Sequence, residues 1–285
     1  MTSPLERLRE VPAGPGRAAL SWLGQAGFVI RGRGVTALVD PFLSPYQGRR
    51  YESALPGDAC TDIDVVLCTH EHVDHFDTVL APVIARVSPQ AVFVVPTPIV
   101  DMVTEVGIAS DRVVGLQPDE TLEVAGLAVR AVPARHGVTM EDAYGFGEEL
   151  SGGLVRFLGY ILDVDGVRIY HAGDTIHFEG MEAMVRELRP DAALLPINGR
   201  DAEREARGIV GNLTEREAAW LADEIGAGVL VPMHHDLFEG NRGWPAHVVE
   251  WVEREDRDVT VVVPPLETPF VLTRDRAQDR SKDRS

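Results

Sequence analysis

The feature that most constrains this 285-residue sequence is the segment Thr69-His-Glu-His-Val-Asp-His75. It places three of the chain's nine histidines and two carboxylates within six positions. Histidine is on average only partly buried in proteins, and so many imidazoles and carboxylates would be costly to desolvate without a partner. The segment therefore predicts a functional cluster rather than a piece of the core.

The spacing inside this segment indicates how its side chains are presented. His70 and His72 are two residues apart, so they share one face if the chain is extended there. Asp74 and His75 follow, where we expect the chain to turn into a helix that starts near Phe76. An extended segment followed by a first helical turn can surround two neighbouring metal ions, with one pair of side chains facing each ion. The spacing therefore favours a binuclear metal site.

Further potential ligands come directly after predicted buried strands. His136 ends the segment Val-Pro-Ala-Arg-His, Asp174 ends Tyr-His-Ala-Gly-Asp, and His234 ends Val-Pro-Met-His. Asp40 likewise ends a strand, and we expect it to orient a ligating imidazole, as carboxylates next to metal ligands do. Because α/β proteins place their ligands at the carboxyl ends of strands, this recurrence strengthens the prediction of a metal site.

Apolar periodicity and turn residues predict two halves, each with strands followed by helices. Strands are expected at 19–24, 27–32, 35–43, 64–70, 91–96, 121–134, 159–174, 192–198, 229–236 and 259–264, and helices at 75–87, 99–107, 181–190 and 217–226. An Asp-Gly pair at 165–166 predicts a hairpin turn, and Thr214-Glu-Arg-Glu217 predicts a capping box. These elements suggest two packed sheets flanked by helices in a single domain over 18–273. We expect a flexible N-terminal arm at 1–17 and a disordered, charged tail at 274–285.

Composition and charge exclude several classes of protein. The formal charge of −18 argues against binding to nucleic acid polymers, whose phosphates would be repelled, but a small anionic substrate stays compatible with it. No apolar run approaches the roughly 20 residues of a membrane span, and the first residues lack an apolar signal core. We therefore expect a cytoplasmic protein without membrane contact, in which Cys60 and Cys68 are reduced structural thiols.

The pattern H-x-H-x-D-H at 70–75, followed in order by His136, Asp174 and His234, resembles the metallo-β-lactamase superfamily. The resemblance covers about residues 18–265 and implies an α/β fold, the αββα four-layer sandwich, with a binuclear site at one edge. It implies that His70, His72 and His136 hold a first ion, that Asp74, His75 and His234 hold a second, and that Asp174 bridges the two. His235 competes with His234 for the role of ligand.

Several further segments resemble the L-ascorbate-6-phosphate lactonase branch of that superfamily. They are Trp22–Gly27, Asp40–Phe42, Leu195–Arg200, Gly211–Thr214 and Pro232–Phe238. This narrower resemblance implies opening of a cyclic ester on a phosphorylated sugar acid, manganese or zinc as cofactor, and self-association into a homo-oligomer. Gln25 departs from the histidine expected in many relatives, and the chain is shorter than the ascorbate enzyme.

The residues after the strand at 192–198 are candidates for substrate binding. Asn198 and Arg200 could hold an anion there, with Arg204 and Arg207 nearby. The alternative is that these arginines belong to a solvated helix and pair with its own glutamates.

Four remaining histidines have different expected roles. His235 and His177 are candidates for the substrate-binding cleft, each with an ordinary surface position as the alternative. His171 and His247 are expected to have no functional role. The seven potential ligands and the four substrate candidates make up the predicted site, with Asp40 behind it.

The predicted chemistry is hydrolysis by a metal-bridging hydroxide, with Asp74 or Asp174 moving a proton to the leaving group. Two divalent ions, Zn²⁺ or Mn²⁺, are the expected cofactors. No P-loop, dinucleotide fingerprint or nucleophile elbow indicates another chemistry. The leading hypothesis is a lactonase or ester hydrolase acting on a small anionic substrate. The alternatives are a phosphodiesterase for small or cyclic nucleotides with the same site, and a non-catalytic metal-binding protein.

Overall fold

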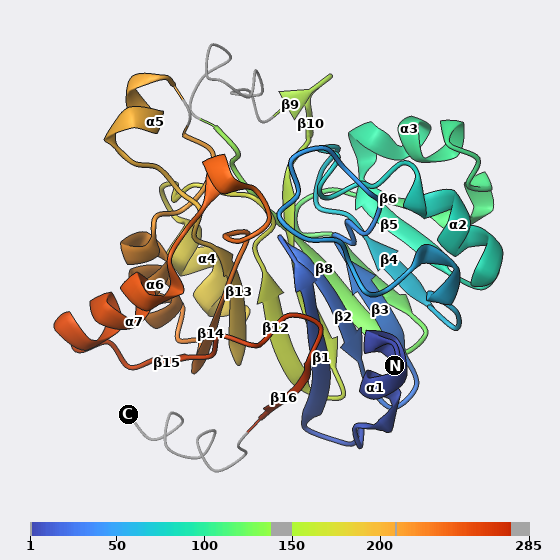
Figure 1. Ribbon diagram of the computed structural model, residues 1–285, viewed down its shortest axis with the longest axis horizontal. Coiled ribbons are helices and arrows are strands. Elements are labelled where there is room, and N and C mark those ends of the chain that lie inside the picture. The colour runs from blue at the N-terminus through green and yellow to red at the C-terminus, as the bar shows by residue number, and fades with distance from the viewer. Residues whose placement is uncertain (1, 138–149, 209, 275–285) are drawn as a thin grey trace.

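The computed structural model describes residues 2–137, 150–208 and 210–274, and these residues form two seven-stranded sheets that pack face to face (Figure 1). The first sheet has the order β16(Pro269–Thr273), β1(Arg17–Gly24), β2(Gly27–Arg31), β3(Thr36–Val39), β4(Val65–Leu67), β5(Val92–Pro96) and β6(Val113–Leu116). The second has the order β15(Thr260–Val261), β14(Val229–Met233), β13(Ala192–Pro196), β12(Val167–His171), β11(Leu158–Val164), β8(Leu127–Pro133) and β7(Thr121–Val124). Two short strands, β9(Leu150–Ser151) and β10(Leu154–Val155), pair with each other.

Each sheet has an antiparallel half and a parallel half. Strands β16 to β3 and β7 to β12 are antiparallel, whereas β3 to β6 and β12 to β15 run parallel. The carboxyl ends of parallel strands lie at one edge of a sheet, where α/β proteins build their sites. Two backbone hydrogen bonds join the sheets there, from Leu158 N to Thr69 O at 3.0 Å and from His234 N to Gln25 O at 2.9 Å.

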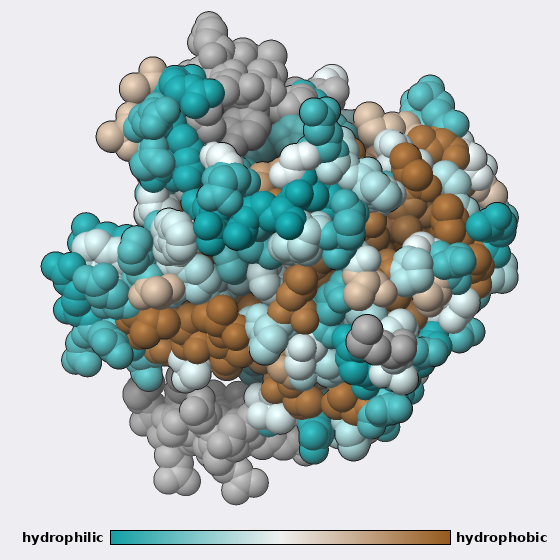
Figure 2. All heavy atoms as spheres, viewed as in Figure 1, coloured by the Kyte–Doolittle hydropathy of each residue, from teal (hydrophilic) through white to brown (hydrophobic). Residues whose placement is uncertain are grey.

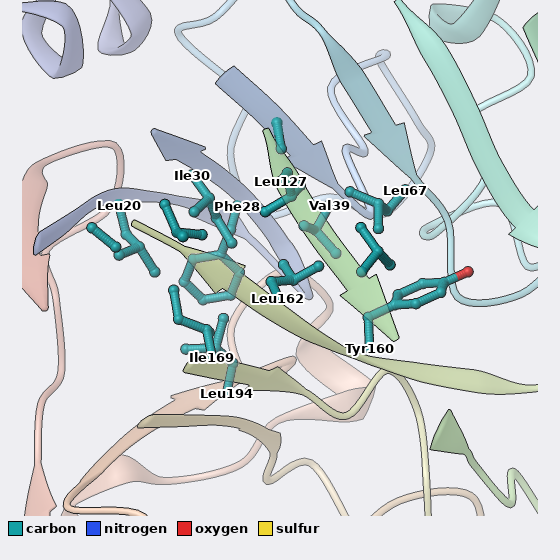
Figure 3. Packing of buried hydrophobic residues seen from close by; sticks show 14 of the residues in the cluster. Leu20, Phe28, Ile30, Val39, Leu67, Leu127, Tyr160, Leu162, Ile169 and Leu194 are labelled. Atoms are coloured by element: carbon teal, nitrogen blue, oxygen red, sulfur yellow. The ribbon is translucent and has the colours of Figure 1, made fainter. Parts of the chain in front are cut away.

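A hydrophobic core fills the space between the two sheets. Side chains from both sheets point into this layer (Figure 3), among them Phe28 and Leu67 from the first and Tyr160, Leu162 and Leu194 from the second. All five are fully buried. Burying such side chains contributes about 1.5–3 kcal/mol each, so this layer fixes how the sheets, and the strand ends that they carry, sit against each other.

Helices cover the outer face of each sheet and complete the four layers (Figure 1). They are α1(Pro4–Glu10), α2(Leu80–Val87) and α3(Val100–Glu105) on the first sheet and α4(Met181–Glu187), α6(Glu215–Glu224) and α7(Pro245–Arg254) on the second. The short helix α5(Ala202–Ala206) has no buried residues and covers neither sheet. The 3₁₀ turns are η1(Gly57–Ala59), η2(Thr97–Ile99), η3(Ser110–Arg112) and η4(Glu239–Asn241). The visible face of the molecule is largely hydrophilic, and its hydrophobic residues gather in separate patches (Figure 2). The αββα sandwich expected from the sequence is the observed fold.

The N-terminal residues are an exception to the sequence-based expectation. Within the supposed flexible arm, Ser3 and Glu6 form a capping box that starts α1, and Leu5 and Leu8 are buried against the first sheet. Arg7 also donates to the carbonyl oxygen of Glu267 at 2.8 Å. The expectation of a flexible arm is therefore wrong for residues 4–10. A helix forms there because Leu5 and Leu8, one helical turn apart, both pack on the apolar outer face of the first sheet. Of the predicted tail 274–285, residues 275–285 lie outside the described residues, as does residue 1. Arg274 donates its backbone N–H to Gly16 O at 3.0 Å.

The helix after the histidine segment starts later than expected. Turns lie at 73–75 and at 78–79, and α2 begins at Leu80 instead of near Phe76. The Asp77 carboxylate explains the shift, because it accepts hydrogen bonds from the N–H groups of Val79 at 3.1 Å and Leu80 at 2.9 Å. Asp74 and His75 therefore lie in a loop between β4 and α2, and a first helical turn does not present them.

Other local predictions hold. Thr214 and Glu217 form the capping box of α6, and Asp165 and Gly166, both with positive φ, form the turn between β11 and β12. Strand β16 was not predicted, since it forms only by pairing with β1 at the far end of the chain. No helix in the described ranges has the length and apolar character needed to cross a membrane. Cys60 and Cys68 are both free and buried.

Candidate metal centre

Seven side chains from both sheets meet at the edge where the parallel strands end. Their ligand atoms form three overlapping groups, and within each group all atoms lie within 4.8 Å of one another. The groups are His70, His72 and His136; His70, His75 and Asp174; and Asp74, His75 and His234. Each member follows a strand. The loop after β4 carries His70, His72, Asp74 and His75, while β8 leads to His136, β12 to Asp174 and β14 to His234. The structure therefore brings together every residue that the sequence singled out as a potential ligand.

A buried carboxylate and a hydroxyl group orient two of the imidazoles. Asp40 accepts hydrogen bonds from His75 Nδ1 at 2.7 Å and from the hydroxyl of Thr69 at 2.7 Å. Because that hydroxyl donates to Asp40, its oxygen accepts from His70 Nδ1 at 3.1 Å. His75 and His70 therefore donate from Nδ1 and direct Nε2 at the cluster, an arrangement typical of metal-binding histidines.

The same orientation recurs on the second sheet. His136 Nδ1 donates to the carbonyl oxygen of Gly211 at 2.6 Å, and its Nε2 lies 3.5 Å from Asp174 Oδ2. His234 Nε2 lies 3.3 Å from the same oxygen and 3.2 Å from Asp74 Oδ2. Asp174 thus lies among imidazoles from both halves of the cluster.

Two atoms at the centre of the cluster lack hydrogen-bond partners among the described residues. They are His75 Nε2 and Asp174 Oδ1, both buried and 3.4 Å apart. Buried polar atoms almost always have partners, and an imidazole nitrogen together with a carboxylate oxygen is a donor set suited to a divalent transition-metal ion. The residues therefore fit a metal centre.

Electrostatics divide the histidines into two sets. Burial lowers the pKa values of His70, His72 and His136, that of His72 to about 4. Their imidazoles are accordingly neutral near pH 7, the form in which histidine binds a metal ion.

The second set faces the carboxylates. Burial opposes the charged form of His75, yet the carboxylates of Asp174, Asp40 and Asp74 outweigh it and raise the pKa of His75 well above its usual value. Burial would likewise raise the pKa of Asp174, but the imidazoles of His234, His75 and His136 hold that pKa well below its usual range. Protons on the imidazoles thus balance the carboxylate charge, and a bound cation would take over that role.

Replacing Asp40 by Asn should weaken this centre without removing a ligand. The amide would lose the negative charge and could not accept from His75, the Thr69 hydroxyl and the Thr69 N–H at once. We expect roughly 10–100-fold weaker metal binding and about 2 kcal/mol lower stability, measured by chelator competition and thermal denaturation. Asp64→Asn is the control, since the Asp64 side chain accepts one backbone N–H, from Thr36 at 2.8 Å. Equal metal affinity in Asp40→Asn and wild type would contradict the orienting role.

Comparison with known proteins identifies the family. A profile described as the Beta-lactamase superfamily domain matches residues 36–235. The chain belongs to the β-lactamase superfamily. Within it, a UPF0173 metal-dependent hydrolase of Methanoculleus marisnigri is 32% identical over 224 residues, which cover 78% of this chain and 83% of the relative. The chain is therefore one of the superfamily's metal-dependent hydrolases.

Two less similar proteins are also related in sequence or fold. The "Probable L-ascorbate-6-phosphate lactonase UlaG" of Salmonella paratyphi B is 25% identical, with 88% of this chain and 79% of that protein covered. The solved structure of Igni18, a metallo hydrolase from Ignicoccus hospitalis, is 24% identical with a TM-score of 0.70, covering 91% of this chain and all of that one. The similarity to Igni18 is a similarity of fold.

In the present chain, Arg200, the predicted anion-binding arginine, has other partners. Arg200 Nη2 lies 2.5 Å from Glu217 Oε1, and its Nε lies 3.1 Å from Glu205 Oε1. Arg204 donates to backbone carbonyls and pairs with Asp201, and Arg207 lies 4.0 Å from Glu203, four residues away. Arg207 thus follows the alternative of pairing with a glutamate of its own helix, whereas Arg200 is held between Glu205 and Glu217, the latter in α6. Anion binding by Arg200 stays a prediction.

The other substrate candidates are also engaged in contacts within the protein. Asn198 donates to Asn241 at 2.9 Å and accepts from Asn212 at 2.9 Å, and Asn212 in turn accepts from the N–H of Thr175, next to Asp174, at 2.8 Å. These amides therefore connect the loops around the cluster instead of offering free hydrogen-bonding groups.

The two candidate histidines lie outside the three ligand groups. His235 is buried and stacks on Trp22 with 5.0 Å between ring centroids, so His234 and not its neighbour joins the cluster. His177 Nε2 lies 3.0 Å from Glu182 Oε2, and its ring packs on Trp220. As expected, His171 has an internal role, with Nε2 donating to the Ala26 carbonyl at 2.8 Å.

Sequence reasoning missed Thr69, whose hydroxyl connects Asp40 to His70. The available signal was its place directly before the first histidine of the segment. It went unused because a single threonine at a strand end is common and its partner, Asp40, lies 29 residues away in the sequence.

Proposed function

We propose that the protein hydrolyses an ester or lactone with two divalent ions, Zn²⁺ or Mn²⁺, bound side by side in the cluster. The observation that carries the proposal is the overlap of the three ligand groups. His70, His72 and His136 form one end, Asp74, His75 and His234 form the other, and the group of His70, His75 and Asp174 links them. One ion would use far fewer donors than this arrangement assembles.

Divalent ions held here would lower the pKa of a coordinated water toward 7 and polarise the attacked carbonyl group. The protein's own contribution is to hold the donors and to move a proton. Asp174 is almost fully buried and has one oxygen without a hydrogen bond, whereas the Asp74 side chain is 16% exposed. Asp74 therefore borders the open side of the cluster, and we assign it the transfer of a proton to the leaving group.

The substrate class rests on similarity rather than on the pocket. The similarity to the probable L-ascorbate-6-phosphate lactonase of Salmonella paratyphi B supports lactone opening, and we propose a small substrate. The expectation that it is anionic loses its main support, because Arg200 pairs with Glu217 and Glu205. A cytoplasmic location, the absence of nucleic acid partners and a homo-oligomeric state stay predictions.

Metal removal and reloading test the proposal. We expect a panel of phosphorylated and unphosphorylated lactones to show turnover that a chelator abolishes and that Zn²⁺ or Mn²⁺ restores. His72→Ala should lower turnover by about 10²-fold or more through loss of a ligand, with an unchanged circular dichroism spectrum. His247→Ala is the matched control, since the His247 side chain is 57% exposed and pairs only loosely with Glu215.

The same assay separates the alternatives. Hydrolysis of bis-p-nitrophenyl phosphate without turnover of any lactone would favour a phosphodiesterase. Tight metal binding without activity on any ester, amide or phosphodiester would favour a non-catalytic metal-binding protein. Either result would contradict the proposed lactonase.

A further inference from the structure

Gln25 occupies an unusually constrained position at the edge of the metal centre. It lies in the turn between β1 and β2, is buried, and adopts a positive φ of 49°. Its backbone N–H donates to Asp236 Oδ1 at 3.2 Å. Its carbonyl oxygen accepts from Trp22 Nε1 and from the N–H of His234, both at 2.9 Å. The turn is therefore fixed to the loop that carries a ligand of the other sheet.

The side chain of Gln25 reaches into the cluster itself. Its Nε2 donates to Asp74 Oδ2 at 2.9 Å and lies 3.3 Å from His234 Nε2. The same oxygen of Asp74 is 3.2 Å from His234 Nε2. The amide thus contacts two of the three side chains in one ligand group, and it contacts neither His70 nor His136 in any hydrogen bond of the described residues.

A second layer holds the turn in place. The hydroxyl of Tyr51 donates to Asp236 Oδ2, while Asp236 Oδ1 accepts from Gln25. Tyr51 also packs so closely on Gly24 that a Cβ atom there would meet its hydroxyl oxygen. A non-glycine residue with positive φ persists only where its surroundings determine it. Here the contacts around the turn orient the neutral amide of Gln25 toward the carboxylate of Asp74.

We propose that Gln25 is a positioning residue that holds the Asp74 carboxylate and thereby sets the affinity of the ion bound by Asp74, His75 and His234. This inference rests on the two-ion site of the proposed function. Asp74 lies in the loop between β4 and α2, at the open side of the cluster, so it needs a partner to keep its oxygen near His234. A neutral donor fixes that oxygen and adds no charge, and it acts on one ligand group only.

Metal titration without substrate tests this role. Metal-free wild type, Gln25→Met and Gln25→Glu would be titrated with Zn²⁺ against a chromophoric chelator, with Gln90→Met as control because Gln90 is exposed on the surface. In Gln25→Met we expect one of two binding steps to weaken by roughly 10–100-fold and the other to change little. In Gln25→Glu the carboxylate cannot donate to Asp74 Oδ2 and repels it, so the same step should weaken as well.

The restriction of the effect to one of the two binding steps separates positioning from a general structural effect. A step that strengthens in Gln25→Glu would show that charge, and not the donated hydrogen bond, sets the affinity, and would overturn the inference. Damage to the fold would weaken both steps in both variants, and that result, like unchanged affinities in both, would overturn the inference. If Gln25→Met does not fold, the isosteric Gln25→Glu carries the test alone. A wild-type chain that binds fewer than two equivalents of Zn²⁺ overturns the proposed two-ion site and this inference with it. Two equivalents in all variants at equal affinity overturn the inference alone.

Discussion

Replacing Asp174 by Asn is expected to lower hydrolytic turnover by roughly three orders of magnitude and to reduce the number of ions bound. Asp174 is the one carboxylate of the described ligand groups with imidazoles on both sides, since its oxygens lie 3.4 Å from His75, 3.5 Å from His136 and 3.3 Å from His234. Asparagine keeps the volume but removes the charge that both ends of the cluster share. Metal analysis and initial rates on the lactone panel measure the two effects.

The control for this variant is Asp119→Asn. Asp119 forms an exposed pair with Arg130 at 2.8 Å, with its side chain 75% exposed, and exposed ion pairs contribute little to stability. This variant should keep wild-type rates and metal content. If Asp174→Asn also kept the wild-type rate and metal content, Asp174 would not link two ions, and the two-ion proposal would be wrong.

The make-up of the candidate site was predictable from the sequence because its residue types are rare and follow buried strands. His136, Asp174 and His234 each come at the end of an apolar run, and parallel strands bring such ends to one edge. The backbone that presents them was less predictable. The chain does not enter α2 near Phe76, because Asp77 accepts hydrogen bonds from the N–H groups of Val79 and Leu80 and the helix begins at Leu80.

The remaining errors of the sequence-based predictions concern residues whose contact partners lie far away in the sequence. Nothing near Arg200 in the sequence indicates that Glu217, 17 residues on, pairs with its guanidinium. Residues 1–17 were expected to form a flexible arm, yet a capping box and the burial of Leu5 and Leu8 against the first sheet stabilise α1 there. Local composition predicts which residues are polar or apolar, whereas the identity of each polar partner depends on the folded arrangement.

Gly199→Ala is expected to be strongly destabilising although it adds a single methyl group. A Cβ atom at position 199 would contact the carbonyl oxygen of Leu213 and lie 2.6 Å from its carbonyl carbon and 2.7 Å from Thr214 Cα. All of these are backbone atoms just before α6, so no side-chain rotation relieves the contact. We expect a loss of about 3 kcal/mol, which corresponds to a decrease in Tm of about 6–12 °C.

Because Asn198 connects to Thr175 through Asn212, the displacement should also reach the residue next to Asp174. Gly199→Ala should therefore lose activity even below its Tm, with kcat affected in the metal-loaded enzyme. Gly228→Ala is the control, since its Cβ would meet only Asp191 O at an ordinary 3.8 Å, and it should change stability by less than about 1 kcal/mol. Similar Tm values for the two variants would show that the loop before α6 can move away from position 199, and the close packing would then not constrain the site.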